Sequence, residues 1–200
     1  MSDTDTHKEA MQKLQAEQKA KVKEAKSIDR GLVLVHTGDG KGKSSSAFGV
    51  VARALGWGHK VAVVQFIKGT WKTGEREFFK RFPDQLDWHT MGEGFTWNTQ
   101  DKDRDIEAAT AAFATATKLM NSGDYDLLVL DEINIALRYD YLDISTVTSA
   151  ILTRSKRTSV IATGRDAKKE LMEIADLVSE MKEIKHPFKA GIKAKQGIDY

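Results

Sequence analysis

The stretch of sequence that decides the fold reads Thr37-Gly38-Asp39-Gly40-Lys41-Gly42-Lys43-Ser44. A short apolar run at 32–35 precedes it, and a segment with apolar residues at helical spacing, 45–55, follows it. Glycines let several backbone N–H groups face one concavity, and the helix that follows adds its N-terminal dipole. The Lys43 ammonium can neutralise phosphate oxygens, and the Ser44 hydroxyl can ligate Mg²⁺. The pattern therefore predicts a phosphate-binding loop between a strand and a helix.

The spacing of this loop departs from the usual G-x-x-x-x-G-K-[ST] pattern. The first glycine falls at Gly38, so the loop is one residue short. A chance turn rich in glycine and lysine is the alternative. We favour the phosphate-binding loop over a chance turn, because a strand precedes the segment, a helix follows it and it ends in Gly-Lys-Ser.

A second motif supports the first. The apolar strand expected at 127–130 runs directly into Asp131 and Glu132. A carboxylate at the end of such a strand lies at the carboxyl edge of the sheet, where the phosphate loop also lies. Asp131 is therefore expected to hold a metal or its water shell, as Walker-B acids do, and Glu132 to activate water or contact the nucleotide. The two motifs predict nucleoside triphosphate binding, but kinases, ATP-driven motors and GTPases all share them.

Apolar runs and helical patterns alternate along the rest of the chain. Strands are expected at 61–66, 86–91, 158–162 and 177–181, and helices at 74–81, 101–120, 144–152 and 167–174. This alternation is typical of βαβ units and predicts an α/β fold with a mainly parallel sheet covered by helices on both faces. We expect one such domain over residues 29–200, preceded by a polar helical extension over residues 1–28.

Composition narrows the class of protein. The 200 residues carry a net charge of +2, which gives no support to a general nucleic-acid or membrane-surface binder. The absence of cysteine excludes disulfides, zinc–thiolate sites and a cysteine nucleophile, and suits a reducing cytoplasm. No apolar run approaches the ~18 residues that span a bilayer, and the N-terminus lacks the apolar core of a signal peptide. A soluble, intracellular protein of one domain is the expectation.

Further motifs follow the expected strands and fill the tail. They are Gln65-Phe66-Ile67-Lys68-Gly69-Thr70-Trp71, Met91-Gly92-Glu93-Gly94-Phe95-Thr96-Trp97, Tyr139-Asp140-Tyr141-Leu142, Thr163-Gly164-Arg165, Lys185-His186-Pro187-Phe188 and Gly197-Ile198-Asp199-Tyr200. Together with the phosphate loop they closely resemble the P-loop type of ATP:corrinoid adenosyltransferase, also called cob(I)alamin adenosyltransferase. The resemblance runs from about the N-terminal helix to the last residue.

The resemblance implies a RecA-like P-loop fold and a homodimer. It implies transfer of the 5′-deoxyadenosyl group of ATP to the cobalt(I) of a reduced corrinoid, with release of triphosphate. ATP would be held reversed, with its γ-phosphate where the α-phosphate usually sits. Mg²⁺ (or Mn²⁺) would accompany ATP, and a reduced flavoprotein would supply the electron.

The resemblance also implies roles for individual residues. Glu132 would lie near the ribose, and Ser44 and Asp131 would hold the metal. Phe95 and Trp97 would flank the corrin ring and displace its lower axial ligand, although ordinary core packing is the alternative for both. Lys43 would join them as a catalytic residue. The nucleotide would lie on Gly38, Asp39, Gly40, Lys41, Gly42, Lys43, Ser44 and Ser45.

Two residues depart from what many relatives carry. Ser44 stands in place of Thr, which keeps the hydroxyl. Asp39 stands in place of Asn and adds a negative charge that would weaken ATP binding, unless its side chain points to solvent.

Arg165 could reach a phosphate, with an exposed ion pair as the alternative. Two other classes of protein stay open on the nucleotide motifs alone, a P-loop ATPase or kinase and a nucleic-acid-dependent RecA-like module.

Overall fold

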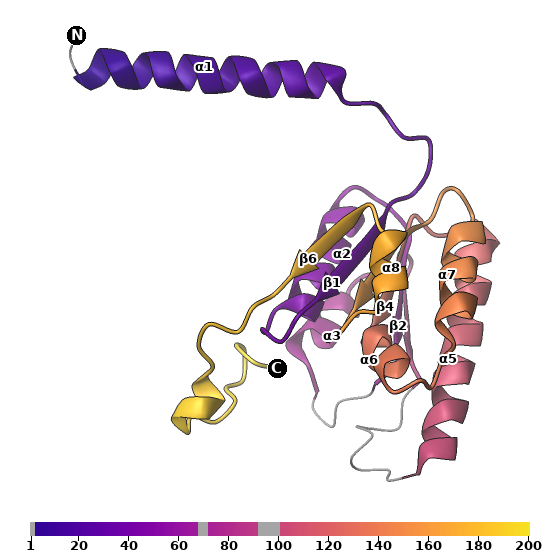
Figure 1. Cartoon of the computed structure of the whole chain (residues 1–200). Coiled ribbons are helices and arrows are strands. Elements are labelled where there is room, and N and C mark those ends of the chain that lie inside the picture. The colour runs from indigo at the N-terminus through magenta and orange to yellow at the C-terminus, as the bar shows by residue number, and fades with distance from the viewer. Residues whose placement is uncertain (1–2, 68–71, 92–100) are drawn as a thin grey trace.

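The computed structural model of the chain describes residues 3–67, 72–91 and 101–200 (Figure 1). Six strands form one parallel sheet in the order β3-β2-β4-β5-β1-β6. They are β1 (Val33–Thr37), β2 (Val61–Gln65), β3 (Leu86–Thr90), β4 (Leu127–Asp131), β5 (Ser159–Thr163) and β6 (Leu177–Glu180). All six strands were expected, with boundaries that differ by one or two residues. The α/β fold with a parallel sheet is confirmed.

Two apolar clusters, one on each face of the sheet, explain why the central strands carry unbroken apolar sequence. Every residue of β4 is buried, because β4 contributes alternately to both clusters. One face packs on α2 (Lys43–Gly56) and α3 (Gly74–Phe79). The other packs on four helices: α5 (Lys102–Ser122), α6 (Ile133–Arg138), α7 (Ile144–Thr153) and α8 (Lys169–Glu173). Helices therefore cover both faces, as expected.

Two short elements were not expected from the sequence. α6 has six residues and begins directly after Glu132, whose backbone adopts a left-handed conformation with φ of 63°. The 3₁₀-helix η1 (Pro187–Ala190) interrupts the C-terminal tail. Neither is long enough to show a helical repeat of apolar residues, which is the signal that sequence reading relies on.

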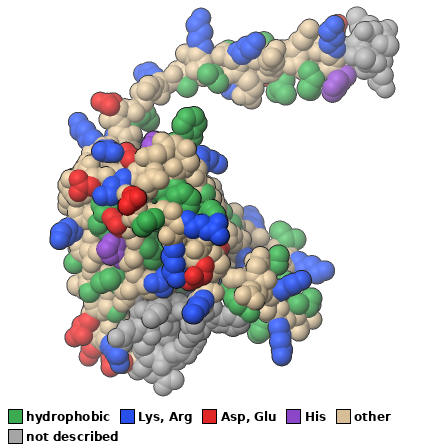
Figure 2. All heavy atoms as spheres, turned by 180° about the vertical axis from the view of Figure 1, so that it is seen from behind, with side chains coloured by type: hydrophobic (Ala, Val, Ile, Leu, Met, Phe, Trp, Pro, Cys, Tyr) green, Lys and Arg blue, Asp and Glu red, His purple; other side chains and the backbone are tan. Residues whose placement is uncertain are grey.

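The N-terminal extension forms α1 (Asp3–Glu24), a 22-residue helix that stands away from the sheet (Figure 1). Its side chains from Thr6 onward are exposed, including Met11, Leu14 and Val22. Figure 2 shows the same projection from behind, with lysines along the helix. Such a polar helix gains little from burial, and a neighbouring surface is needed to stabilise it. No helix among the described residues is long and apolar enough to cross a membrane.

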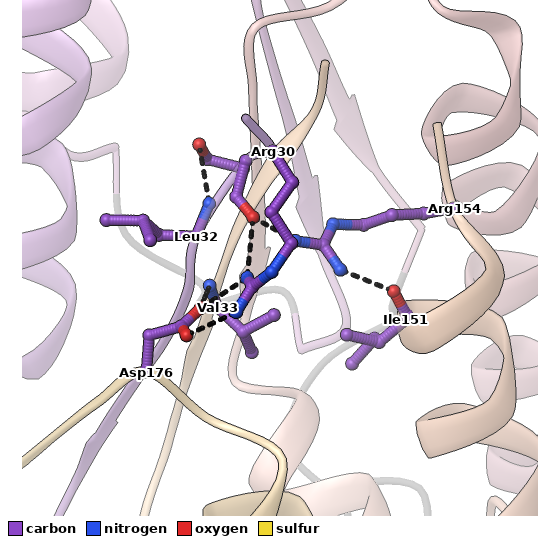
Figure 3. Close-up of polar contacts among 8 residues, drawn as sticks. Arg30, Leu32, Val33, Ile151, Arg154 and Asp176 are labelled. Carbon is purple, nitrogen blue, oxygen red and sulfur yellow. Dashed lines mark hydrogen bonds and ion pairs between the residues drawn. The ribbon is translucent and has the colours of Figure 1, made fainter. Parts of the chain in front are cut away.

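A polar junction joins the extension to the amino edge of the sheet (Figure 3). The two terminal guanidinium nitrogens of Arg30 donate to the Asp176 carboxylate, at 2.7 and 2.8 Å, and the Val33 N–H donates to the same group at 2.9 Å. Arg154 donates to the carbonyl oxygens of Gly31, Ile151 and Thr158, each at 2.6 Å. Residues 30–33, 151–158 and 176, from three parts of the chain, are thereby fixed where β1 begins.

Asp176→Asn is expected to lower the free energy of unfolding by about 1 kcal/mol at neutral pH, because it loses a charge-assisted pair at a partly exposed site. The Arg30 hydrogen bonds and the Val33 N–H lower the pKa of this carboxyl to about 2. A depressed pKa stabilises the folded protein above the carboxyl's ordinary pKa, and the stabilisation is lost as the pH falls through about 2. Denaturant unfolding between pH 2 and 7 should show the two proteins converging at the acid end. A constant difference across that range would contradict this assignment.

Candidate functional site

The phosphate loop connects β1 to α2 and packs on the backbone that follows β6. Gly38 and Gly42 have φ of 98° and 110°, which only glycine adopts readily. A Cβ at Gly38 would lie 2.4 Å from the Met181 carbonyl oxygen, and one at Gly40 would lie 2.8 Å from the Lys182 backbone. The Gly40 N–H donates to the Met181 carbonyl at 2.7 Å, and the Met181 N–H donates to Thr37 at 2.8 Å. The glycines therefore permit both the turn and its close packing against the tail.

Lys43 lies at the first position of α2 with its side chain buried. Its ammonium donates to the carbonyl of Gly40 within the loop at 2.8 Å. Burial lowers the pKa of this ammonium, against an opposing effect of the Glu132 charge. An ammonium has three N–H donors, so the contact to Gly40 leaves two for phosphate oxygens.

Asp131 lies at the carboxyl end of β4, and its side chain is buried and held on both oxygens. The Thr163 hydroxyl donates to Oδ1 at 2.8 Å, and the Gln65 amide donates to Oδ2 at 3.0 Å. Thr163 also accepts the Glu132 N–H at 2.9 Å. The carboxylate expected from the sequence is therefore fixed between the ends of β2 and β5.

Glu132 turns its carboxyl into a tight space beside Gly164. Its Oε2 is buried without a hydrogen-bond partner among the described residues, and a Cβ at Gly164 would lie 3.1 Å from it. Gly164 has φ of 127°, and its carbonyl accepts from the Asn134 amide at 3.0 Å. Burial and the Asp131 charge raise the pKa of Glu132 to about 7, although Lys43 and Arg165 oppose the shift. A buried acceptor of this kind suits a ligand hydroxyl, which can donate to it.

Asp39 points outward from the loop toward Arg165. Its carboxylate lies 4.0 Å from Nε of Arg165, and both side chains are at least half exposed. Arg165 also donates to the Asp39 carbonyl at 3.3 Å. The two residues line a pocket of about 460 Å³, whose other lining includes Lys182, Glu183 and Lys189 of the tail. The Asp39 side chain is thus exposed and lies near a cation, and its effect on ATP binding stays a prediction.

Comparison with known proteins decides between the reactions that a phosphate loop allows. The family model described as ATP:corrinoid adenosyltransferase BtuR/CobO/CobP matches residues 29–200. This chain belongs to that family. The matched residues cover the sheet, the phosphate loop and the tail, and they begin where α1 and its connecting segment end.

Full-length relatives agree with the family assignment. A corrinoid adenosyltransferase of Pseudomonas aeruginosa is 52% identical, over 97% of this chain and 95% of the relative. Corrinoid adenosyltransferases of Salmonella typhimurium and Escherichia coli K12 are 42% and 40% identical, over 100% of both chains. Among solved structures, the flagellar accessory protein FlaH from Methanocaldococcus jannaschii has a TM-score of 0.47 at 14% identity, covering 77% of this chain and 72% of that one.

The adenosyltransferase fold brings most of the expected site residues to one edge of the sheet. The loop glycines, Lys43 and Ser44 lie at the junction of β1 and α2, and Asp131 and Glu132 lie at the end of β4. Ser45 and Lys41 are exposed, and the Lys41 ammonium pairs with Asp199 in the tail at 2.5 Å. Phe95 and Trp97, expected beside the corrin ring, lie outside the described residues.

Three site residues had no assigned role in the sequence analysis. Gln65 and Thr163 bind Asp131, and Asn134 binds the backbone of Gly164. Gln65 and Thr163 each end an apolar strand, so the reasoning applied to Asp131 could have found them. Nothing in the sequence marks Asn134, because its partner follows a strand 30 residues away.

Proposed function

We propose that this adenosyltransferase binds the triphosphate of ATP on residues 38–45 and presents C5′ to the cobalt(I) of a reduced corrinoid. The single observation that carries the proposal is the phosphate loop, with its left-handed glycines and the buried Lys43 at the start of α2. Cobalt(I) donates the electron pair of the new Co–C5′ bond, and the C5′–O bond breaks with its pair leaving on triphosphate. No side-chain base is required. The protein supplies position and stabilises the departing charge.

The residues at the loop fit a magnesium ion accompanying ATP. Mg²⁺ prefers oxygen ligands and usually takes one or two from protein, together with phosphates and water. The Ser44 hydroxyl and the Asp131 carboxylate supply such oxygens, and Mn²⁺ would suit the same set. No group of three or more metal-ligating side chains occurs within residues 3–67, 72–91 and 101–200. When bound, the ion would neutralise charge on the triphosphate.

Glu132 is proposed to accept a hydrogen bond from a ribose hydroxyl. Its buried Oε2 has no partner in the described part of the chain, and its left-handed backbone places it between Asp131 and α6. A hydroxyl donor would offset the cost of burying that oxygen. Gly164 leaves room for the contact, because any larger residue there would crowd the carboxyl.

Surface features support proposals about partners. The tail exposes Ile184, Phe188 and Ile198, and Figure 2 shows lysines among its hydrophobic side chains. Exposed apolar side chains favour an interface, which we assign to a homodimer. A reduced flavoprotein is the proposed electron donor and the cytoplasm the proposed compartment. The domain over residues 29–200 is proposed to carry the chemistry.

The extension over residues 1–28 is proposed to act as a lid over the corrinoid. Deleting residues 1–26 should leave the melting temperature and ATP affinity near those of the full chain, because α1 is exposed along its described length. The KM for the corrinoid should rise by about tenfold, as expected when a closing element is lost. Steady-state kinetics and thermal unfolding check both parts. A fall in melting temperature like that of a core mutation would contradict the lid.

The proposed reaction is tested by incubating the protein with ATP, Mg²⁺ and chemically reduced cobalamin. The expected products are a light-sensitive cobalt–carbon species and one triphosphate per turnover. An ordinary P-loop ATPase or kinase would instead cleave at the γ-phosphate and release ADP. Release of ADP with no cobalt–carbon product would overturn the proposal.

A further inference from the structure

A chain of hydrogen bonds crosses the carboxyl edge of the sheet at Gln65. Gln65 stands opposite Asp131 of β4 and Thr90 of β3 in the strand register. Its amide nitrogen donates to Asp131 Oδ2 at 3.0 Å. Its amide oxygen accepts from Trp88 Nε1 at 2.9 Å and from the Thr90 hydroxyl at 3.3 Å. Gln65 therefore links the nucleotide-side carboxylate to the edge strand of the sheet.

The chemistry of the partners fixes the direction of every bond in this chain. An indole N–H can only donate, so the atom of Gln65 that faces Trp88 is the amide oxygen, and the amide nitrogen faces Asp131. On the other side, Thr163 accepts the Glu132 N–H and has one hydroxyl hydrogen, which it gives to Asp131. Each oxygen of Asp131 thus receives one hydrogen bond and keeps capacity for a further contact.

Trp88 anchors this series of hydrogen bonds, because its partly buried ring packs against the apolar cluster under α2. Its ring lies 5.3 Å from Phe48 of α2 and 6.0 Å from Phe79 of α3, measured between ring centroids. Its side chain therefore has little freedom, and the orientation of the Gln65 amide is fixed from the core outward. α2 begins at Lys43, so the anchor and the phosphate loop belong to one packed unit.

We propose that Gln65 is a positioning residue for metal-dependent ATP binding. This inference rests on the proposed function, in which Asp131 holds the metal or its water shell. A carboxylate free to rotate loses that freedom when it takes up an ion, whereas Gln65 and Thr163 restrict Asp131 beforehand. Partners that orient a ligating carboxylate in this way typically affect metal affinity by about 10–100-fold.

The test is Gln65→Met, which keeps the length of the side chain and removes its amide. ATP affinity is measured by calorimetry in excess EDTA and across a Mg²⁺ titration. The Mg²⁺ concentration that gives half of the full gain in ATP affinity should rise about tenfold. The affinity for metal-free ATP should stay within about twofold of wild type, because the loop that binds phosphates is untouched.

Two further variants keep the test decisive. Trp88→Phe retains the aromatic packing and removes the donor to Gln65, so it should shift the Mg²⁺ requirement in the same direction by a smaller factor. Gln85→Met is the matched control, since Gln85 is a half-buried glutamine directly before β3, at the amino edge of the sheet. It should titrate like wild type.

Distinct results overturn the inference. A Gln65→Met protein with an unchanged Mg²⁺ requirement, or with equal losses in EDTA and in Mg²⁺, overturns the positioning role and leaves the proposed reaction standing. A shift of the same size in Gln85→Met also overturns it. If the ATP affinity of the wild-type protein does not depend on Mg²⁺, the inference is overturned together with the metal part of the proposed function. Should Gln65→Met fail to fold, Trp88→Phe decides, and an unchanged requirement there overturns the role.

Discussion

Replacing Lys43 with alanine should lower kcat/KM for adenosyl transfer by about 10³-fold, at the upper end of what one charged or oriented donor contributes. The Lys43 ammonium is buried at the mouth of the loop, with donors to spare beyond Gly40. In the proposed complex it would contact the triphosphate in the ground state and in the transition state, where negative charge on the leaving group grows. Steady-state rates with saturating cobalt(I) corrinoid and varied ATP measure the loss.

A control for general charge loss is Lys169→Ala, because Lys169 is an exposed lysine on α8. This variant should match wild type. A Lys43→Ala protein that keeps most of its kcat/KM would show that residues 38–45 do not hold the reacting nucleotide. The proposed mechanism would then fail at its first step.

Replacing both Phe95 and Trp97 with alanine should separate cobalt reduction from adenosyl transfer. If the aromatic pair displaces the lower axial ligand, the loss of that ligand lowers the energy of the cobalt orbital that accepts the electron. Cobalt(II) then becomes easier to reduce. Turnover from cobalt(II) with a weak protein reductant should fall by about 100-fold or more, as when a reacting group is misplaced. With cobalt(I) supplied by a strong chemical reductant, the loss should be much smaller. ATP affinity should change little.

Ordinary core packing of Phe95 and Trp97 predicts a different result. Truncating a buried aromatic side chain costs about 3–5 kcal/mol, so both assays would fall together with the melting temperature. Equal losses in the two assays, in a destabilised protein, would therefore remove the axial-ligand role. Phe113→Ala is a matched control, since Phe113 is a buried aromatic residue of α5 in the apolar cluster between the sheet and that helix.

The fold was predictable where it depends on local sequence patterns. The central strands are apolar runs, and the phosphate loop is defined by glycines and a lysine adjacent in sequence. α6 was missed because six residues span less than two helical turns, too few to show a period. Its start depends on a left-handed glutamate, a conformation that sequence rarely marks.

The site was predictable only in part, because its remaining contacts come from strand register. Asp131 was expected from its place at the end of β4, but its partners Gln65 and Thr163 are 66 and 32 residues away. Which residues face each other across parallel strands depends on how the crossovers pack, and no local pattern records it. The need for glycine at position 164 could not be predicted either, because it arises from the nearby side chains of Glu132 and Asn134, which a Cβ would crowd.

Because the phosphate loop packs against the tail, we expect the C-terminal segment to respond when a nucleotide binds to the loop. The Gly40 N–H donates to the Met181 carbonyl, the Met181 N–H donates to the Thr37 carbonyl, and Lys41 forms an ion pair with Asp199 near the end of the chain. A ligand that immobilises the loop therefore reduces the entropy lost when the tail orders, and by thermodynamic reciprocity an ordered tail strengthens the ligand's hold. Amide hydrogens at Gly40 and Met181 should exchange with solvent more slowly once triphosphate is bound, although Met181 lies 138 residues beyond Lys43 in the chain.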